Sequence, residues 1–193
     1  MLRRSFTVVV AILLLATAAG AETFEGHCDF HFYARSTLHK FAGKGSCQPF
    51  VLVSEKTDQG TDIVRSPVIS VAVKEMDTDN SGRDSKMYTM FESDRYPVIR
   101  SKFKDLVVEE TLRQLRGEGN VNGRLDFDLQ VRDIKKSVKA EIHGLLVTPE
   151  QVAFQMEFPL SLEDFGLKPP SVLGLIRVDD QVRVEVMVSL SRH

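Results

Sequence analysis

Apolar and polar residues alternate along most of the chain after residue 21, which is the pattern of strands with one buried face. The apolar rows are Leu125, Phe127, Leu129 and Val131; Val152, Phe154, Met156, Phe158, Leu160 and Leu162; Val182, Val184, Val186, Val188 and Leu190; and Cys28, Phe30 and Phe32. Further strands are expected around residues 43–54, 63–74, 97–108 and 136–147. Because closure removes exposed strand edges, these eight strands predict an all-β, eight-stranded antiparallel barrel.

One segment, SGRDSKMYTMFESD, departs from the strand alternation. It places Met87, Met90 and Phe91 at the spacing of one helix face, and Ser81 stands where a capping box would begin. The Tyr-Pro pair that follows ends a helix. We predict a short helix around residues 82–94 that covers one end of the barrel.

The turn before this helix, DTDNSG, resembles the start of an EF-hand loop, because Asp77, Asp79 and Ser81 alternate ahead of Gly82. The twelfth position of such a loop must supply a bidentate carboxylate, and here it is Tyr88. The residues before the turn alternate like a strand instead of forming the helix that an EF-hand needs. Turn chemistry therefore explains these residues better than a calcium site does.

The N-terminus has the form of a secretory signal peptide. Arg3 and Arg4 precede an apolar run over residues 6–16, and an Ala-Gly-Ala cleavage site follows. The run is too short to span a bilayer, which takes about 20 apolar residues. We predict that residues 1–21 are cleaved and that residues 22–193 form one periplasmic domain without a transmembrane segment.

The composition narrows the partners and the redox chemistry. The formal net charge is −2, and no basic patch stands out, so nucleic acid is a poor partner. The chain has two cysteines, Cys28 and Cys47, and an even count in an exported protein favours a disulfide. A disulfide that closes such a short loop stabilises the folded state by about 3 kcal/mol. The spacing is not that of a C-x-x-C redox motif.

Metal and catalytic motifs are incomplete. His27, Asp29 and His31 would share one strand face, but no third ligand from another strand is evident, so we expect no metal site. The Asp-Phe-Gly at residues 164–166 has no kinase nucleotide or catalytic loop beside it. No Gly-x-Ser-x-Gly elbow is present. We therefore predict no catalytic residues and a protein that is not an enzyme.

The interior of such a barrel can be filled or can hold a ligand. The chain has 12 Phe and 6 Met but no Trp. Phe and Met suit an adaptable apolar cavity and suit an ordinary core equally well. The pattern alone leaves both possibilities open.

Four blocks follow one another along most of the mature chain: STLHKFAGKG (36–45), DTDNSGRDSKMYTMFESDRYPVI (77–99), GRLDF (123–127) and DFGL (164–167). In order and spacing they resemble the YceI-like family of polyisoprenoid-binding periplasmic proteins. The resemblance implies a lipocalin-like barrel with a long apolar tunnel that holds an isoprenoid chain, such as a quinone tail or a polyprenyl phosphate. Where relatives commonly carry Asn-Arg ahead of Asp-Phe-Gly, this chain has Ser161-Leu162, so an Arg contribution from that position is absent.

From this resemblance we expect a periplasmic carrier of an isoprenoid-like lipid, with no cofactor other than a bound polyisoprenoid or isoprenoid quinone. The predicted ligand-binding residues are Phe30, Phe32, His39, Arg83, Met87, Met90, Phe91, Phe127, Phe154, Met156, Phe158 and Val184. Arg83 would either meet a polar head group or, with Asp84, form a helix cap and an ion pair. His39 would either face the mouth of the tunnel or bind a loop carbonyl.

Two other functions stay open at this point. A filled barrel would make the chain an interaction module for another envelope protein. A lipid-modifying enzyme would use His39 and Asp84. The sequence also leaves open whether the chain forms a homodimer.

Overall fold

The computed structural model describes residues 21–118, 122–169, 171–172 and 176–192. The predicted signal peptide lies outside the described residues except for Ala21, so its cleavage stays a prediction. Within the described part of the chain, no helix is both long enough and apolar enough to cross a membrane.

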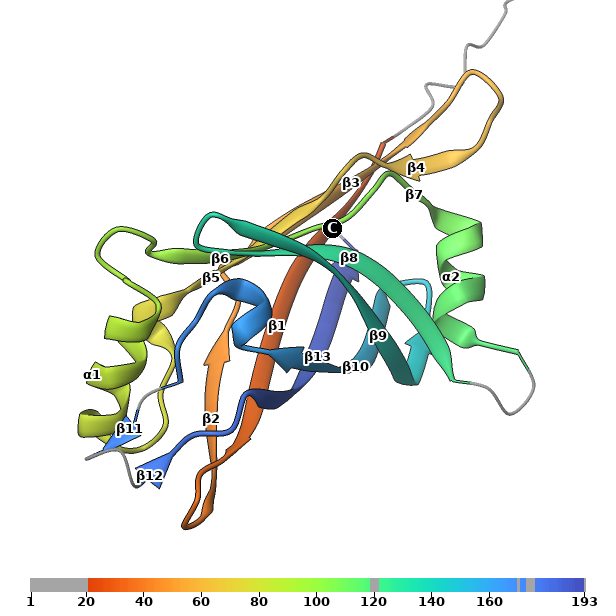
Figure 1. The fold of residues 1–193 in the computed structure, drawn as a ribbon. Coiled ribbons are helices and arrows are strands. Elements are labelled where there is room, and N and C mark those ends of the chain that lie inside the picture. The colour runs from red at the N-terminus through yellow and green to blue at the C-terminus, as the bar shows by residue number, and fades with distance from the viewer. Residues whose placement is uncertain (1–20, 119–121, 170, 173–175, 193) are drawn as a thin grey trace, which may run out of the picture.

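The fold is a curled antiparallel sheet with a helix at each end (Figure 1). Its strands are β1 (Glu22–Arg35), β2 (Lys40–Ser46), β3 (Phe50–Lys56), β4 (Asp62–Val64), β5 (Val68–Ala72), β6 (Val98–Lys102), β7 (Leu106–Val107), β8 (Gly123–Val131), β9 (Ile134–Val147), β10 (Gln151–Ser161) and β13 (Gln181–Arg192). The order is β5-β6-β8-β9-β10-β13-β1-β3-β4-β7, and β2 also pairs with β1. A separate hairpin joins β11 (Ser171–Val172) to β12 (Ile176–Arg177). The all-β barrel class is confirmed.

The number of strands is larger than predicted because three expected strands are broken and the β11–β12 hairpin was not predicted. The segment 43–54 divides into β2 and β3, and 63–74 divides into β4 and β5. Ser66 adopts a positive φ of 36° and precedes Pro67, which ends β4. The segment 97–108 divides into β6 and β7, and its last residue already belongs to a helix.

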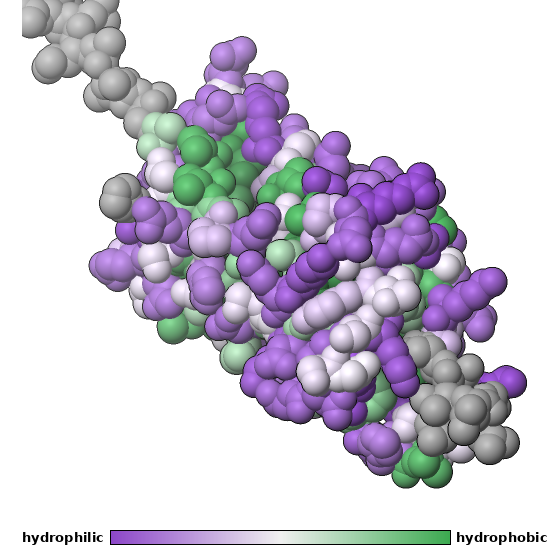
Figure 2. All heavy atoms as spheres, turned by 90° about the vertical axis from the view of Figure 1, so that its left-hand side faces the viewer, coloured by the Kyte–Doolittle hydropathy of each residue, from purple (hydrophilic) through white to green (hydrophobic). Residues whose placement is uncertain are grey.

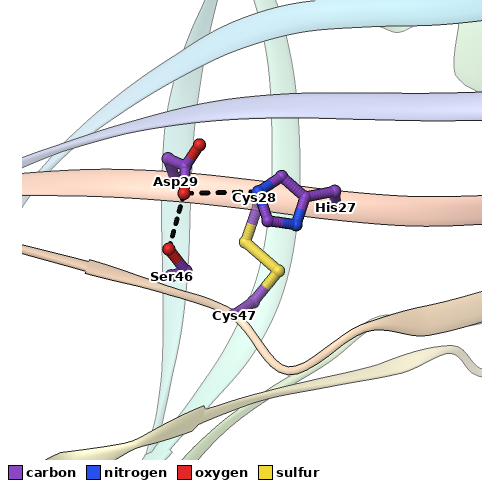
Figure 3. The surroundings of a disulfide bond; sticks show 5 residues. All are labelled: His27, Cys28, Asp29, Ser46 and Cys47. Atoms are coloured by element: carbon purple, nitrogen blue, oxygen red, sulfur yellow. Dashed lines mark hydrogen bonds and ion pairs between the residues drawn. A yellow bond between two sulfur atoms is a disulfide. The ribbon is translucent and has the colours of Figure 1, made fainter. Parts of the chain in front are cut away.

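Strand β1 is the spine of one wall. It pairs with β13 along most of its length, while its other edge pairs first with β3 and then with β2. The predicted disulfide between Cys28 and Cys47 is confirmed where β1 changes partner, with a Cα–Cα distance of 5.3 Å. Figure 3 shows the neighbouring Asp29, which accepts a hydrogen bond of 2.6 Å from the Ser46 hydroxyl. The disulfide and this bond hold the link between β2 and β3 against β1.

The sheet curls until its β5 edge approaches the edge that β2 forms beside β1. The ladder starts at β5, and the segment after β2 reaches it, where the Gln48 N–H donates to the Ser70 carbonyl at 2.8 Å. Lys44 and Asp77 exchange two backbone hydrogen bonds of 2.8 and 2.9 Å. The barrel is therefore drawn together by separate backbone bonds at this seam.

Helix α1 (Ser81–Met90) matches the predicted capping helix, but its cap and its end differ from expectation. The N-cap is Asn80, whose side chain accepts a 2.9 Å bond from the Arg83 N–H, so the assignment of the cap to Ser81 was wrong. The helix ends at Met90, before residue 94, because Glu92 adopts a positive φ of 51° that cannot continue a helix.

Helix α2 (Val108–Arg116) was not predicted at all. Its first turn carries Glu109 and Glu110, its last turn carries Arg113 and Arg116, and it ends at a glycine. These charges complement the helix dipole. Short 3-10 helices, η1 (Val73–Glu75) and η2 (Glu163–Phe165), complete the elements.

Candidate functional site

Inward-facing side chains of β10, β13 and β1 form successive levels across one wall of the curled sheet. The strand register places them as Phe158, Val184 and Phe32; Met156, Val186 and Phe30; and Phe154, Val188 and Cys28. Because strand residues alternate between faces, the predicted apolar rows meet side by side.

These levels border an elongated cavity of about 520 Å³. Along β1 its lining reaches from Glu22 to Ala34, which at about 3.3 Å per residue corresponds to about 40 Å of strand. Both helices contribute to the lining, α1 at one end and α2 at the other. The volume lies in the range of small-molecule sites, which is about 300–1,000 Å³.

The structure places most of the predicted ligand-binding residues at this cavity. Those that line it are Phe30, Phe32, Arg83, Met87, Met90, Phe91, Phe154, Met156, Phe158 and Val184. Phe127 is only 3% exposed and is not part of the lining; its ring packs between Phe103 and Phe158, with centroids 5.3 and 5.4 Å away. His39 is exposed outside the cavity, and its carbonyl accepts a bond from the Ser36 hydroxyl.

Arg83 is a cation at the α1 end of an otherwise apolar wall. Its Nη2 donates to the Thr78 carbonyl at 2.7 Å, and its guanidinium carbon lies 4.5 Å from the centroid of the Phe41 ring. Its Nε is buried and has no hydrogen-bond partner among the described residues. A buried donor without an acceptor is costly, so Arg83 makes the α1 end the polar end of this wall.

Asp84 does not form the expected ion pair with Arg83. Its carboxylate instead accepts bonds from the N–H and the hydroxyl of Thr78, at 3.0 and 2.5 Å. Tyr88 donates to the Met76 carbonyl at 2.7 Å, and burial raises the pKa of that phenol. These bonds fix α1 to the segment before it, and Arg83 remains part of the cavity lining.

The acidic residues of the EF-hand-like turn have a cation of their own. The Lys44 ammonium lies 3.0 Å from Asp79 and 3.8 Å from Asp77. The hydrogen bond to Asp79, helped by both negative charges, raises the pKa of Lys44. The Asp77 carboxylate also accepts the Asp79 N–H at 2.7 Å, as expected for turn chemistry.

The outer side of the α1 end is polar. Figure 2 looks onto the side where α1 lies and shows a mostly hydrophilic surface, with apolar side chains gathered mainly towards the top of the view. The exposed residues of α1 include Ser81, Ser85 and Lys86, whereas Met87 is buried beneath the helix. Helix α1 therefore separates a polar, solvent-exposed surface from an apolar interior.

The α2 end of the cavity has a different chemistry. Leu112 and Leu115 form the apolar face of α2 and line the cavity. Glu22 and Arg192 lie at the rim and pair with each other at 2.6 Å. Asp62, also at this rim, pairs with Lys56 at 2.9 Å. The charges at this end therefore already have partners.

Several lining residues were missed from the sequence. They are Phe24, Phe41, Phe50, Val108, Thr111, Leu112 and Leu115. The helical spacing within VEETLRQLR, with acids first and arginines last, was the signal for the α2 residues. Phe24 and Phe41 lie before the predicted starts of their strands, whereas Phe50 lies inside the predicted segment 43–54, which the structure divides into β2 and β3.

The histidine-rich face of β1 carries no assembled metal site. The His27 Nε2 lies 3.3 Å from the Asp29 carboxylate. The hydrogen bond from Ser46, with help from His27, lowers the pKa of Asp29. Over the described ranges, no group of three or more His, Cys, Asp or Glu is placed to bind a metal ion.

Comparison with known proteins identifies relatives of this fold. The family model for the YceI-like domain matches residues 24–190. The solved structure of BcnA from Burkholderia cenocepacia superposes with a TM-score of 0.60 at 10% identity, covering 84% of this chain and 95% of that one. A polyisoprenoid-binding domain from Saccharophagus degradans gives a TM-score of 0.55 at 10% identity, covering 90% and 100%. Among curated proteins, none matches the chain.

Proposed function

The chain belongs to the family of YceI-like domains, and we propose that it is a binding protein for an isoprenoid lipid held in the cavity of the curled sheet. The observation that carries this proposal is an elongated cavity whose lining is apolar along nearly its whole length. The solved polyisoprenoid-binding domain with the same fold supports the choice of ligand class.

Apolar burial supplies the binding free energy in this proposal. Each Å² of apolar surface removed from water contributes about 25 cal/mol, before the cost of ordering the ligand is subtracted. A chain of several isoprene units presents a long apolar surface, and the lining from Glu22 to Ala34 is long enough to cover much of it. Few polar contacts are then needed.

The α1 end of the cavity is the place that we assign to the head group of the ligand. We place a quinone carbonyl or a polyprenyl phosphate at the α1 end, where the cation Arg83 is part of the lining. The tail then runs past Phe32 and Phe30 towards α2. The predicted signal peptide would deliver this carrier to the periplasm.

The two rival functions receive less support. A filled barrel is at odds with a cavity of about 520 Å³. The enzymatic alternative needs His39 and Asp84 together, but His39 is exposed outside the cavity and Asp84 is bonded to Thr78.

Binding can be tested by titration calorimetry with decylubiquinone and geranylgeranyl phosphate. Phe154→Asp places a carboxylate in the cavity at the level of Val188 and Cys28, and we expect affinity for both probes to fall by more than about tenfold. Gln155→Asp, one residue along β10 and therefore on the opposite face, is the matched control. Tight binding by folded Phe154→Asp would contradict the assignment of the cavity.

Arg83 needs a separate variant. Arg83→Met keeps much of the side chain's apolar length and removes the guanidinium. If Arg83 meets the head group, this variant weakens binding of geranylgeranyl phosphate more than binding of geranylgeraniol, which lacks the charge. Equal losses for both probes would remove Arg83 from the head-group role.

A further inference from the structure

Three glycines of β1 and β2 stand directly opposite phenylalanines across the sheet. The register pairs Gly45 with Phe30, Gly43 with Phe32, and Gly26 with Phe50. A Cβ added to any of these glycines would lie closer than 3.0 Å to the ring of its partner, a separation that real Cβ atoms essentially never show. Each ring therefore occupies the place where the opposite side chain would have been.

The position of the rings determines how much of the interior stays empty. A phenylalanine opposite a glycine can lean across the neighbouring backbone, as glycine–aromatic pairs do in other sheets. All three rings line the cavity. Because they lean along the wall, they cover its surface without crossing the space in front of it.

These three pairs lie in the middle of the cavity. Along β1 they run from Gly26 to Phe32, on both sides of Cys28. At the levels of Phe30 and Phe32, the neighbouring strand β13 presents Val186 and Val184, which are short side chains. This part of the cavity, from Gly26 to Phe32 along β1, is called the midsection below. It is bordered by the three phenylalanine rings and by the two valines.

We propose that Gly26, Gly43 and Gly45 are specificity-determining residues, which keep the midsection just wide enough for a single slender isoprenoid chain to pass from the α1 end to the α2 end. This inference rests on the proposed function and extends it to residues that would not themselves be expected to hold a ligand. Their contribution is the absence of a side chain.

An alanine at these positions should change the cavity without unfolding the protein. None of the three glycines adopts a positive φ, so alanine fits the backbone. The atoms in the way of its Cβ belong to the outer part of a phenylalanine ring, which can turn. The empty cavity is where that ring has room to go. Gly43→Ala should therefore push the Phe32 ring into the path of the ligand.

The experiment measures binding of geranylgeraniol to four purified proteins by titration calorimetry, with their melting temperatures. Gly43→Ala is expected to lower affinity by at least about tenfold while remaining folded. Gly43→Ala combined with Phe32→Leu, which removes the ring, is expected to restore most of it. Gly82→Ala is the matched control, because a Cβ there meets nothing closer than 3.5 Å, and its affinity should equal that of the unmodified protein.

The outcomes separate this inference from the function it rests on. If the unmodified protein fails to bind geranylgeraniol, the proposed function fails. If it binds and folded Gly43→Ala binds equally well, the role of the glycines is overturned while the function stands. If Gly43→Ala lowers the affinity and adding Phe32→Leu does not restore it, the role of the glycines is also overturned, because the ring is then not the obstacle. Gly45→Ala with Phe30→Leu repeats the test at the next level if Gly43→Ala does not fold.

Discussion

The two ends of the cavity are lined by helices that are held in different ways. Helix α1 is fixed by polar bonds: Asn80 caps it, Asp84 binds Thr78, and Tyr88 reaches a backbone carbonyl. Helix α2 has no side-chain cap at its N-terminus, and its buried Leu115 packs against the sheet. At its other end, Gly123 of β8 lies so close to the Leu115 carbonyl that a Cβ would overlap it.

The difference bears on function. Polar bonds hold a helix in one orientation, and the α1 end is where the Arg83 guanidinium must point in a fixed direction. Apolar packing is less directional, and the α2 end offers apolar surface to the far part of a ligand. We interpret α1 as the end that recognises a head group and α2 as the end that covers a tail.

The largest effect should come from removing the packing under α2. Leu115 is 5% exposed, and Leu115→Ala is expected to lower the free energy of unfolding by about 2–5 kcal/mol. Arg113→Ala, on the exposed face of the same helix, should change it by less than about 0.5 kcal/mol. Chemical denaturation measures both. Equal small effects would mean that packing does not hold α2.

A smaller effect should come from the cap of α1. Asn80→Ala removes the acceptor of the Arg83 N–H and should cost about 1 kcal/mol in thermal or chemical unfolding. Ser81→Ala is the informative control, because Ser81 is the residue that the sequence suggested as the cap. If Ser81→Ala proves the more harmful of the two, our assignment of the cap is wrong.

The smallest effect should be a pH dependence of stability that comes from Asp29, which lies on β1 between the two ends of the cavity. The hydrogen bond from Ser46 holds the pKa of this carboxyl below its ordinary value of 3.8. Its stabilising contribution is therefore present above pH 3.8 and is lost as the pH falls through the lower pKa of the folded state. The group is half-exposed, so the contribution is below about 1 kcal/mol.

The measurement compares melting temperatures of the unmodified protein and Asp29→Asn from neutral to acidic pH. The difference should shrink as the solution becomes acidic. A difference that stays constant with pH would show that the charge of Asp29 contributes nothing.

The same contrast between the two ends explains what the sequence could predict. The α1 end is indicated by local chemistry, namely an Asx-rich turn and a helical spacing of Met87 and Met90. The strands between the two ends are indicated by the strict alternation of apolar and polar residues. Both signals lie within a few neighbouring residues, which is the range that pattern reasoning covers.

Helix α2 carries a local signal, with acids in its first turn and arginines in its last, but it follows the short strand β7 directly and has no capping side chain to mark its start. The other missed features depend on distant partners. Phe127 alternates like the lining residues, but the rings of Phe103 and Phe158 pack around it. The division into β2 and β3 follows from β1 exchanging one partner for the other.

The central claim is that this cavity holds an isoprenoid lipid, and mass spectrometry of a native extract tests it most directly. The protein would be purified from a bacterial periplasm without detergent, shown to be folded and disulfide-bonded, and extracted with organic solvent. Our account predicts a quinone or polyprenyl species in near-stoichiometric amount, and its loss from Phe154→Asp. An empty extract, together with no uptake of decylubiquinone or geranylgeranyl phosphate by the purified protein, would contradict the account.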